Sequence, residues 1–567
     1  MNAAHTLSSD VVVVGAGLAG LCASLSAADA GARVILLCDG SLCGGSSFSR
    51  ATWGLGMVHE PEGAHIRGPE SLYKALCDVG MDMDDPMLSE ALISGAPESV
   101  AFLRGLGAEI KDPQSPNERE FIACFDTRIR SWHGFVGNAS RDAFVQALAR
   151  RGVKVLEHCE PLTLTRDDAG ACGLVAVQHQ SDADSLTLHN LFILLAIEAQ
   201  AVILATGGCC GLYGHHLCPP SSRGVGHALA LEAGARVTNL EFQQLMLGSL
   251  SPTAGIIFNE KLYRWSHFVD AKGEDAFSRA GYDDKTAGQA LETHAGHGPF
   301  TTARPSYVVE EVLDGAACAG SPCQVTYDDC IFSESAPEFV KTYLTWLRDE
   351  RGVDAREPMT VGMFAHSSNG GICIGADGQT DVAGLYACGE CAGGVHGADR
   401  IGGLASLTAA TFGRYAGIAA AECARERRGL EHGSCTACSE LRLVVPDEGL
   451  RVRREVGRIL DHAAMVVRSG DELRAALREL GELERDLDAA TQTLKVPGIE
   501  GVNEDHLALL CWGRDASARI LMAKAILRSC LERNETRGPH YRVDCPQTDA
   551  RQAKPQVWSL ADIESQV

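Results

Sequence analysis

Short apolar runs, bounded by glycines and polar residues, mark the first elements of the chain. The run from Asp10 to Val14 predicts a buried β-strand, the Ala-rich segment from Leu18 to Ala30 a buried helix, and the run from Arg33 to Leu37 a second strand. These three segments predict a βαβ unit. Another buried strand is predicted from Ala201 to Ala205, and helical spacing follows from Val225 to Ala233.

The second half of the chain is richer in helical spacing. Gly371 to Ile374 and Leu385 to Cys388 predict short strands, and Leu404 to Ala421 predicts a long apolar helix. From Leu450 to Leu487 charged and apolar residues recur at helical spacing, and Leu507 to Leu531 continues as helix. An irregular tail is expected after that.

Changes in texture along the chain predict its domains. Between 241 and 358 periodicity is weak and Gly, His, Asp and aromatic residues are scattered, which is typical of an inserted domain or lid, and 427–444 is polar enough for a linker. We therefore predict an α/β fold: a Rossmann-type domain in two parts, 1–240 and 361–430, an inserted α+β domain at 241–360, and a helical domain with its tail at 445–567.

Length and charge narrow the class of protein. The chain has 567 residues, too many for one compact core, and a net charge of −24. Such an acidic surface repels phosphate backbones, so we expect no nucleic-acid partner. Since no apolar run is long enough to cross a bilayer and the N-terminus lacks the features of a signal peptide, we expect no direct membrane insertion and a cytoplasmic location.

The 22 cysteines do not indicate a disulfide framework in a chain of this length. Two CxxC pairs, Cys388–Cys391 and Cys435–Cys438, each lack a second pair at zinc-finger spacing. We therefore predict no metal site and a reducing environment.

The strongest motif is GxGxxG at Gly15, Gly17 and Gly20, placed between a predicted strand and a predicted helix. The first glycine makes the turn, the second lets the backbone approach a pyrophosphate, and the third lets helix and strand pack closely. An acid is expected at the end of the second strand to bind ribose. Cys38 stands in that register and Asp39 follows it, so Asp39 is the candidate, with backbone groups as the alternative.

NAD and FAD share this fingerprint, and distant glycines favour FAD. Thr206-Gly207-Gly208 ends a strand about 190 residues on, and Gly389-Glu390 ends another near residue 390. A long cofactor that runs through the protein needs contacts spread in this way.

Several segments also carry a family resemblance. They are VVVVGAGLAG at 11–20, GGSS at 44–47, LATGG at 204–208, SRGVGHALALEAGARVTNLEFQ at 222–243, TDVAGLYACGECAGGVHGADRIGG at 380–403 and RNETRGPHYRVDCP at 533–546. With them the chain resembles, over almost its whole length, the flavoprotein subunits of succinate dehydrogenase and fumarate reductase and L-aspartate oxidase. The resemblance implies FAD, a discontinuous FAD-binding domain, a capping domain and a C-terminal helical domain.

The resemblance also implies most of the cofactor contacts. Ser46 and Ser47 would lie against the FAD phosphates, and Glu390 would hold the ribityl chain. The full set of expected cofactor-binding residues is Gly15, Gly17, Leu18, Ala19, Gly20, Asp39, Gly45, Ser46, Ser47, Thr206, Gly207, Gly208, Glu390, Ala405, Ser406 and Leu407.

Three residues are implied, by the same resemblance, to act on substrate. Arg400, in the HGADR segment, matches an arginine that grips a substrate carboxylate, and a guanidinium suits this role because its planar fork binds two oxygens at once. His366 matches an active-site histidine that binds substrate, and Arg304 matches an arginine that transfers a proton. His396 and Glu260 are further expected substrate contacts.

One departure from the family pattern concerns the substrate. Met246 stands where the dicarboxylate enzymes carry a histidine that contacts the second carboxylate, and Leu404-Ala405 replaces an expected Asn-Ser. Methionine cannot hold a carboxylate and would instead pack against an apolar group. Met246 is thus a candidate substrate contact that leaves fumarate, succinate and aspartate open as substrates.

The leading hypothesis is an FAD-dependent oxidoreductase that transfers hydride between the flavin and a carbon next to a carboxylate of a small molecule. An L-aspartate oxidase is one alternative, and a flavin-binding subunit without catalytic activity, or an RNA-modifying flavoprotein, is another. The negative charge opposes the RNA hypothesis. A separate electron-donor protein is left open as a partner.

We predict that FAD is bound without a covalent link. The respiratory members of the family attach FAD through a histidine just after the second strand, whereas this chain has Ser47 in that register and no histidine from Ser41 to Val58. Acid precipitation should release the yellow flavin into the supernatant. Flavin that stays with the denatured chain would contradict the prediction.

Overall fold

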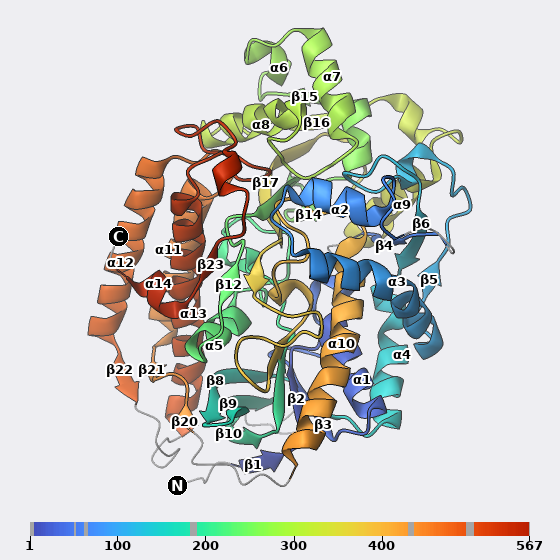
Figure 1. Ribbon diagram of the computed structural model, residues 1–567. Helices are drawn as coiled ribbons and strands as arrows, with labels where there is room; N and C mark the ends of the chain where they lie inside the picture. The colour runs from blue at the N-terminus through green and yellow to red at the C-terminus, as the bar shows by residue number, and fades with distance from the viewer. Residues whose placement is uncertain are drawn as a thin grey trace.

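The computed structural model describes residues 5–49, 53–61, 66–181, 190–428, 436–494 and 504–565. Figure 1 shows two open β-sheets and their helices in the lower part, a smaller unit of helices and strands above them, and long C-terminal helices along one side. Both chain ends lie on the outside of this assembly.

The centre of the lower part is a parallel five-stranded sheet, whose strands are short and largely buried. In sheet order they are β19 (Leu385–Ala387), β11 (Ala201–Leu204), β2 (Val11–Val14), β3 (Val34–Leu37) and β7 (Lys154–Leu156). Valine and leucine on both faces of β2 and β3 are what a parallel sheet covered by helices requires. The predicted βαβ unit is confirmed, with α1 (Leu18–Asp29) between β2 and β3.

Helix α10 (Leu404–Arg427) packs along α1, and it extends beyond the predicted end at 421. Small residues let the two helices approach closely. A Cβ built on Gly413 would lie 2.5 Å from the backbone oxygen of Ala19, and one on Gly417 would lie 2.3 Å from that of Ala23. The contact holds the segment that follows the HGADR motif against the first βαβ unit.

A second sheet lies below the first and is largely antiparallel. Its strands, in order, are β1 (His5–Ser8), β10 (Asn190–Glu198), β9 (Gly170–Ser181), β8 (Cys159–Asp167) and β20 (Thr436–Ala437). Strand β20 falls in 427–444, which was predicted as a linker. That prediction is wrong for this stretch, because two residues are too few for an alternating pattern to reveal a strand.

The upper unit contains a five-stranded sheet in the order β14 (Ile256–Ile257), β13 (Gln243–Ser251), β17 (Met359–Ser368), β16 (Gln324–Tyr327) and β15 (Ser266–Val269). Strands β13 and β17 are long and antiparallel, and they run from this sheet down to the flavin-facing part of the chain. Because β17 runs across the boundary predicted at 360, the sheet joins the two predicted domains. The partition of the chain into domains stays a prediction.

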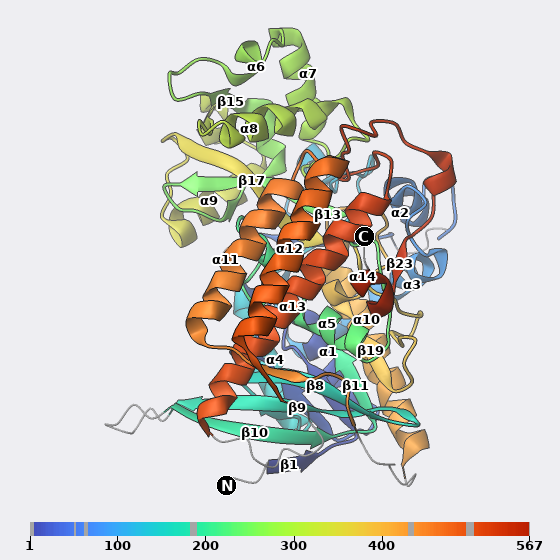
Figure 2. The same ribbon diagram turned by 90° about the vertical axis from the view of Figure 1, so that its left-hand side faces the viewer.

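Three long helices form the C-terminal unit: α11 (Pro446–Ala463), α12 (Gly470–Ala490) and α13 (Glu504–Glu532). Figure 2 shows them side by side, standing over the sheet of β8, β9 and β10. The apolar spacing predicted from 450 to 487 is divided between two helices by a turn at 464–469.

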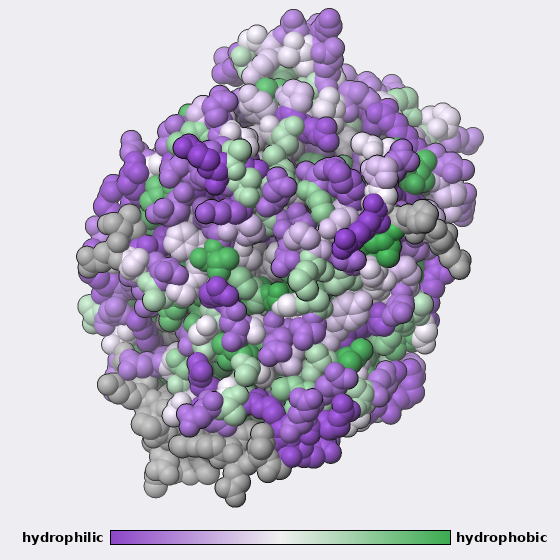
Figure 3. Space-filling view, in the orientation of Figure 1, coloured by the Kyte–Doolittle hydropathy of each residue, from purple (hydrophilic) through white to green (hydrophobic). Residues whose placement is uncertain are grey.

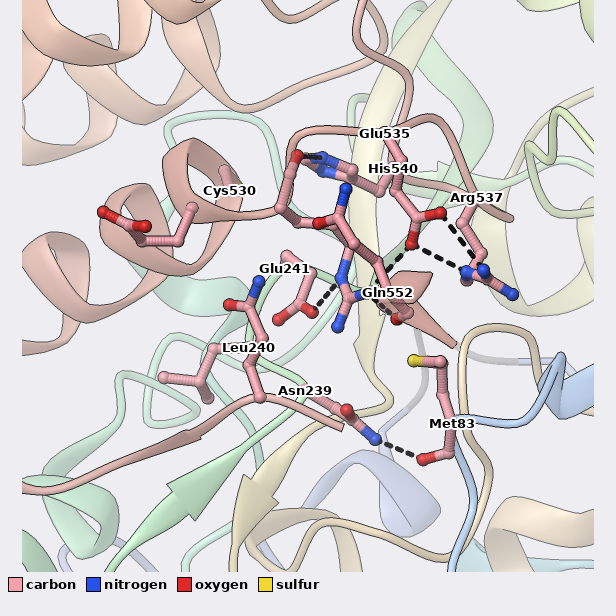
Figure 4. Close-up of polar contacts among 12 residues, drawn as sticks. Met83, Asn239, Leu240, Glu241, Cys530, Glu535, Arg537, His540 and Gln552 are labelled. Atoms are coloured by element: carbon pink, nitrogen blue, oxygen red, sulfur yellow. Dashed lines mark hydrogen bonds and ion pairs between the residues drawn. The ribbon is translucent and has the colours of Figure 1, made fainter. Parts of the chain in front are cut away.

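The segment after α13 has little regular structure, as expected, but its first part is buried. Arg533 Nε donates to Glu241 Oε1 at 2.6 Å, and Glu535 accepts from both Arg533 and Arg537, at 2.9 and 2.8 Å. Figure 4 shows these carboxylates and guanidiniums facing one another beside strand β17. The ion pairs fix the tail to the residues that precede β13.

On the face shown in Figure 3 hydrophilic residues predominate and hydrophobic residues are scattered among them. Among the described residues there is no helix with the length and apolar character needed to span a bilayer.

The buried Arg533 cluster predicts a mutational effect. Arg533→Met removes the partner of Glu241, whose side chain is fully buried, so we expect a loss of about 3–5 kcal/mol of folding free energy. The midpoint of thermal unfolding, followed by circular dichroism, should fall accordingly. Arg551→Met is the control, because Arg551 pairs with Asp549 but its side chain is 91% exposed; equal shifts in the two variants would refute the assignment.

Candidate active site

The carboxyl edge of the parallel sheet is shaped by glycines that leave no room for side chains. Gly15 has φ +109°, and a Cβ on it would lie 2.3 Å from the backbone oxygen of Ala205. A Cβ on Gly20 would lie 1.8 Å from the oxygen of Gly15. The ends of β2 and β11 and the start of α1 can therefore approach one another only because these positions are glycine.

A cavity of about 420 Å³ opens at this edge. Most of the predicted cofactor residues line it: Gly15, Gly17, Leu18, Ala19, Asp39, Gly45, Ser46, Ser47, Thr206, Gly207 and Glu390. The remaining five do not: Gly20, Gly208, Ala405, Ser406 and Leu407. The last three lie in the first turn of α10, which reaches the cavity through Ala409.

The cavity has the features that a dinucleotide needs. It begins at the N-terminus of α1, where backbone N–H groups and the helix dipole favour a pyrophosphate. Opposite this helix Gly45 crosses Gly17 so closely that a Cβ on Gly45 would lie 2.9 Å from Gly17 Cα. The hydroxyl of Thr206 is buried there without a partner among the described residues. These residues fit FAD, whose phosphates and hydroxyls would supply the missing contacts.

Glu390 lies at the inner end of the cavity, in the turn η7 (Gly389–Cys391) after β19. Its carboxylate accepts from the backbone N–H of Ser368 at 2.9 Å and from the hydroxyl of Ser367 at 3.3 Å. Burial raises the pKa of Glu390, whereas these bonds and the charge of Arg400 lower it. The carboxylate therefore links the cofactor cavity to the end of β17.

Arg400 is the central cation of the site. Its Nη2 donates to the side-chain oxygen of Gln244 at 2.7 Å, and its Nε is buried with no partner among the described residues. Burial lowers the pKa of Arg400, and Glu390 and Cys124 oppose that shift. An arginine needs a compensating acceptor for a buried N–H, so a ligand oxygen is the missing partner.

His366 lies on β17 within the electrostatic reach of Arg400. Burial, followed by the charge of Arg400, lowers its pKa to about 3, and its Nδ1 has no partner in the described part of the chain. The imidazole is therefore neutral near pH 7. A neutral ring can donate one hydrogen bond to a substrate and accept another.

Two residues beside Arg400, Gln244 and Cys124, were not predicted from the sequence. The thiol of Cys124 donates to Glu260, a predicted substrate contact, at 3.2 Å, and its backbone oxygen accepts from Gly402. Burial raises the pKa of Cys124 far above the usual value, so the thiol stays protonated. No motif marks either residue, because their roles depend on which segments pack against Arg400.

Arg304 is exposed and lies in the loop just before the turn η5 (Pro305–Tyr307) of the upper unit. It lines a separate cavity of about 550 Å³ together with Asp399. Asp399 accepts from the hydroxyl of Thr301 at 2.6 Å, and burial raises its pKa to about 7, against the influence of Thr301 and Arg304. The loop that carries Arg304 is thus tied to the residue next to Arg400.

Two predicted substrate contacts are packed differently. Met246 is 5% exposed and lies in a small apolar cluster with Leu217 and Phe364, after a register shift in β13 that follows Gln244. His396 is buried, and its Nε2 is 3.2 Å from the hydroxyl of Thr408. In both cases the described contacts are made by the protein itself.

No cluster of three or more metal-ligating side chains is present among the residues that the structure describes. Cys388 and Cys391 are both buried and free of disulfides, and Cys435 of the second CxxC pair lies outside the described residues.

Comparison with known proteins gives matches over nearly the whole chain. The FAD binding domain family matches residues 10–406, and the fumarate reductase flavoprotein C-terminal family matches residues 453–565. A subunit of the fumarate reductase (CoM/CoB) of Methanothermobacter marburgensis is 27% identical, with 95% of each chain covered. L-Aspartate oxidase of Streptomyces coelicolor is 28% identical, with 95% of this chain and 89% of the relative covered.

Among solved structures, a quinol-fumarate reductase with menaquinol molecules is similar in fold. Its TM-score is 0.72 at 21% identity, over 96% of this chain and 94% of that chain. The predicted fold class, cofactor and enzyme class are confirmed by these matches. The chain belongs to the FAD-binding flavoprotein family of fumarate reductase, succinate dehydrogenase and L-aspartate oxidase, and is an FAD-dependent oxidoreductase.

Proposed function

We propose that this oxidoreductase reduces a carbon–carbon double bond next to a carboxylate, or catalyses the reverse reaction, with Arg400 as the residue that binds the carboxylate. The observation that carries the proposal is the buried Nε of Arg400, which lacks an acceptor among the described residues beside the cofactor cavity. FAD, when bound, supplies or accepts the hydride.

Arg400 is suited to fix the substrate because its guanidinium is itself held. Gln244 accepts from Nη2, and its amide nitrogen lies 3.4 Å from the backbone oxygen of Arg400. A fork fixed in this way can bind a carboxylate through two oxygens and keep the double bond at a constant distance from the flavin.

We assign His366 a second contact to the substrate. As a neutral imidazole it would donate a hydrogen bond to the carboxylate or to an adjacent carbonyl. Such a bond polarises the double bond toward hydride addition, because negative charge develops on the carboxylate side.

Proton transfer is assigned to Arg304, on the loop that Thr301 ties to Asp399. Since Arg304 is exposed in a cavity of about 550 Å³, it has access to water. Asp399 lines the same cavity with a pKa of about 7, so it can exchange a proton near neutral pH.

The proposed substrate is a small carboxylate, and its second functional group is left open by Met246. The packing of Met246 against Leu217 and Phe364 supports an apolar surface at this position rather than a second carboxylate contact. A separate protein as electron donor, FAD held without a covalent bond and a cytoplasmic location complete the proposal.

The function is tested by flavin reoxidation. Enzyme reduced chemically under anaerobic conditions is mixed with a panel of α,β-unsaturated carboxylates, aromatic ones included, and the return of oxidised-flavin absorbance is followed. We expect at least one acid to reoxidise the flavin. If none does while L-aspartate reduces the oxidised enzyme, the protein is an L-aspartate oxidase, and the proposal fails.

A substitution of Arg400 tests the assigned role directly. Arg400→Lys keeps the charge but loses the planar fork, so kcat/KM for the active carboxylate should fall by about 100-fold or more, with FAD content unchanged. Arg414→Lys is the matched control, because Arg414 on α10 donates to Ser99 and Glu98, away from Gln244. Similar kinetics in the two variants would remove Arg400 from the substrate site.

A further inference from the structure

Arg223 is a residue of the cofactor cavity that no motif marks. It lies just before α5 (Val225–Glu232), and its side chain is 17% exposed. Asp39 and Glu160, which line the same cavity, are both ion-paired with it. The candidate ribose acid and this arginine therefore form one group.

Three carboxylates surround the guanidinium of Arg223. Nη1 donates to Asp39 Oδ2 at 3.0 Å and Nη2 to Glu160 Oε2 at 3.2 Å, while Nε lies 2.6 Å from Asp515 Oδ1. A guanidinium has five N–H donors, so donors remain beyond the two hydrogen bonds. Because the residue lines the cavity, those donors can reach a cofactor oxygen.

The third carboxylate comes from another part of the fold. Asp515 lies on α13, and its second oxygen accepts from Arg519 Nε at 2.8 Å. Arg519 in turn donates to the backbone oxygen of Gly211, in the turn η3 (Cys210–Leu212) that follows β11. Helix α13 is thus attached by charges both to Arg223 and to the segment after the LATGG motif.

We propose that Arg223 is a further FAD-binding residue at the ribose end of the cofactor, and that Asp515 of α13 holds it in position, so that the C-terminal helices determine how tightly FAD is retained. Arg223 orients the carboxylate of Asp39 toward the ribose hydroxyls and offers its remaining N–H groups to the cofactor. Tight retention matters in a flavoprotein with Ser47 in place of the linking histidine. The inference is independent of the substrate.

The arrangement has a thermodynamic consequence. If ordered Asp515 favours bound FAD, bound FAD must equally favour ordered α13, because coupling between two sites is reciprocal. FAD should therefore slow amide exchange in α13, and the effect should depend on Asp515.

The test compares two carboxylates of buried ion pairs that join α13 to the α5 region. Asp515→Asn removes the charge beside Arg223. The control, Glu232→Gln, removes the charge that pairs with Arg514, which donates to Glu232 at 2.7 Å, and Glu232 does not line the cavity. Release of FAD from each holoenzyme is followed by the rise in flavin fluorescence on dilution, and unfolding midpoints are measured in parallel.

We expect the Kd for FAD to rise by about 10- to 100-fold in Asp515→Asn and to stay near the wild-type value in Glu232→Gln. Hydrogen exchange should show protection of α13 by FAD in the control and its loss in Asp515→Asn. Equal Kd values in the two variants would reduce the ion pairs to a structural role and overturn the proposal.

Arg223→Lys provides a second, independent variant, which carries the test if Asp515→Asn does not fold. A lysine keeps one positive charge but cannot bridge three carboxylates, so FAD release should again accelerate. Arg514→Lys is its control. Unchanged FAD release in Arg223→Lys would also refute the proposal.

Discussion

The close approach of backbone segments at the carboxyl edge of the parallel sheet is the constraint on which the rest of the site depends. Gly15 and Gly20 approach each other and Ala205 at distances that no Cβ allows. Because β2, β11 and β19 end at this edge, the turns that follow them meet there, and Thr206 and Glu390 are brought together from positions far apart in the sequence. The cavity exists because these turns contain no side chain at their crossing points.

Polar and charged side chains connect the other units to this edge. Arg533 and Glu241 join the C-terminal tail to the start of β13, Thr301 and Asp399 join the loop of Arg304 to the HGADR segment, and Asp515 joins α13 to Arg223. Each pair is at least largely buried. A buried charge without a partner is costly, so each of these contacts specifies one relative position of two units.

The first βαβ unit and the cofactor class could be predicted because they rest on local patterns. A strand, GxGxxG and an Ala-rich helix at Gly15 to Ala30 depend on residues that are neighbours in the chain. The weak periodicity between 241 and 358 hid a five-stranded sheet, since β13 and β17 are buried on both faces and show no alternation. The roles of Gln244 and Cys124 were missed for a related reason: each acts through Arg400, more than 100 residues away.

The sequence by itself therefore determined the dinucleotide-binding fold, FAD as the cofactor and the arginine, histidine and glutamate side chains available for chemistry. Only the tertiary structure decided which of them meet. It left Arg400 with a donor unfilled by the described residues, packed Met246 into an apolar cluster, and surrounded Arg223 with three carboxylates. The physical reason is that local sequence sets backbone conformation, whereas the partner of a buried charge is set by long-range packing.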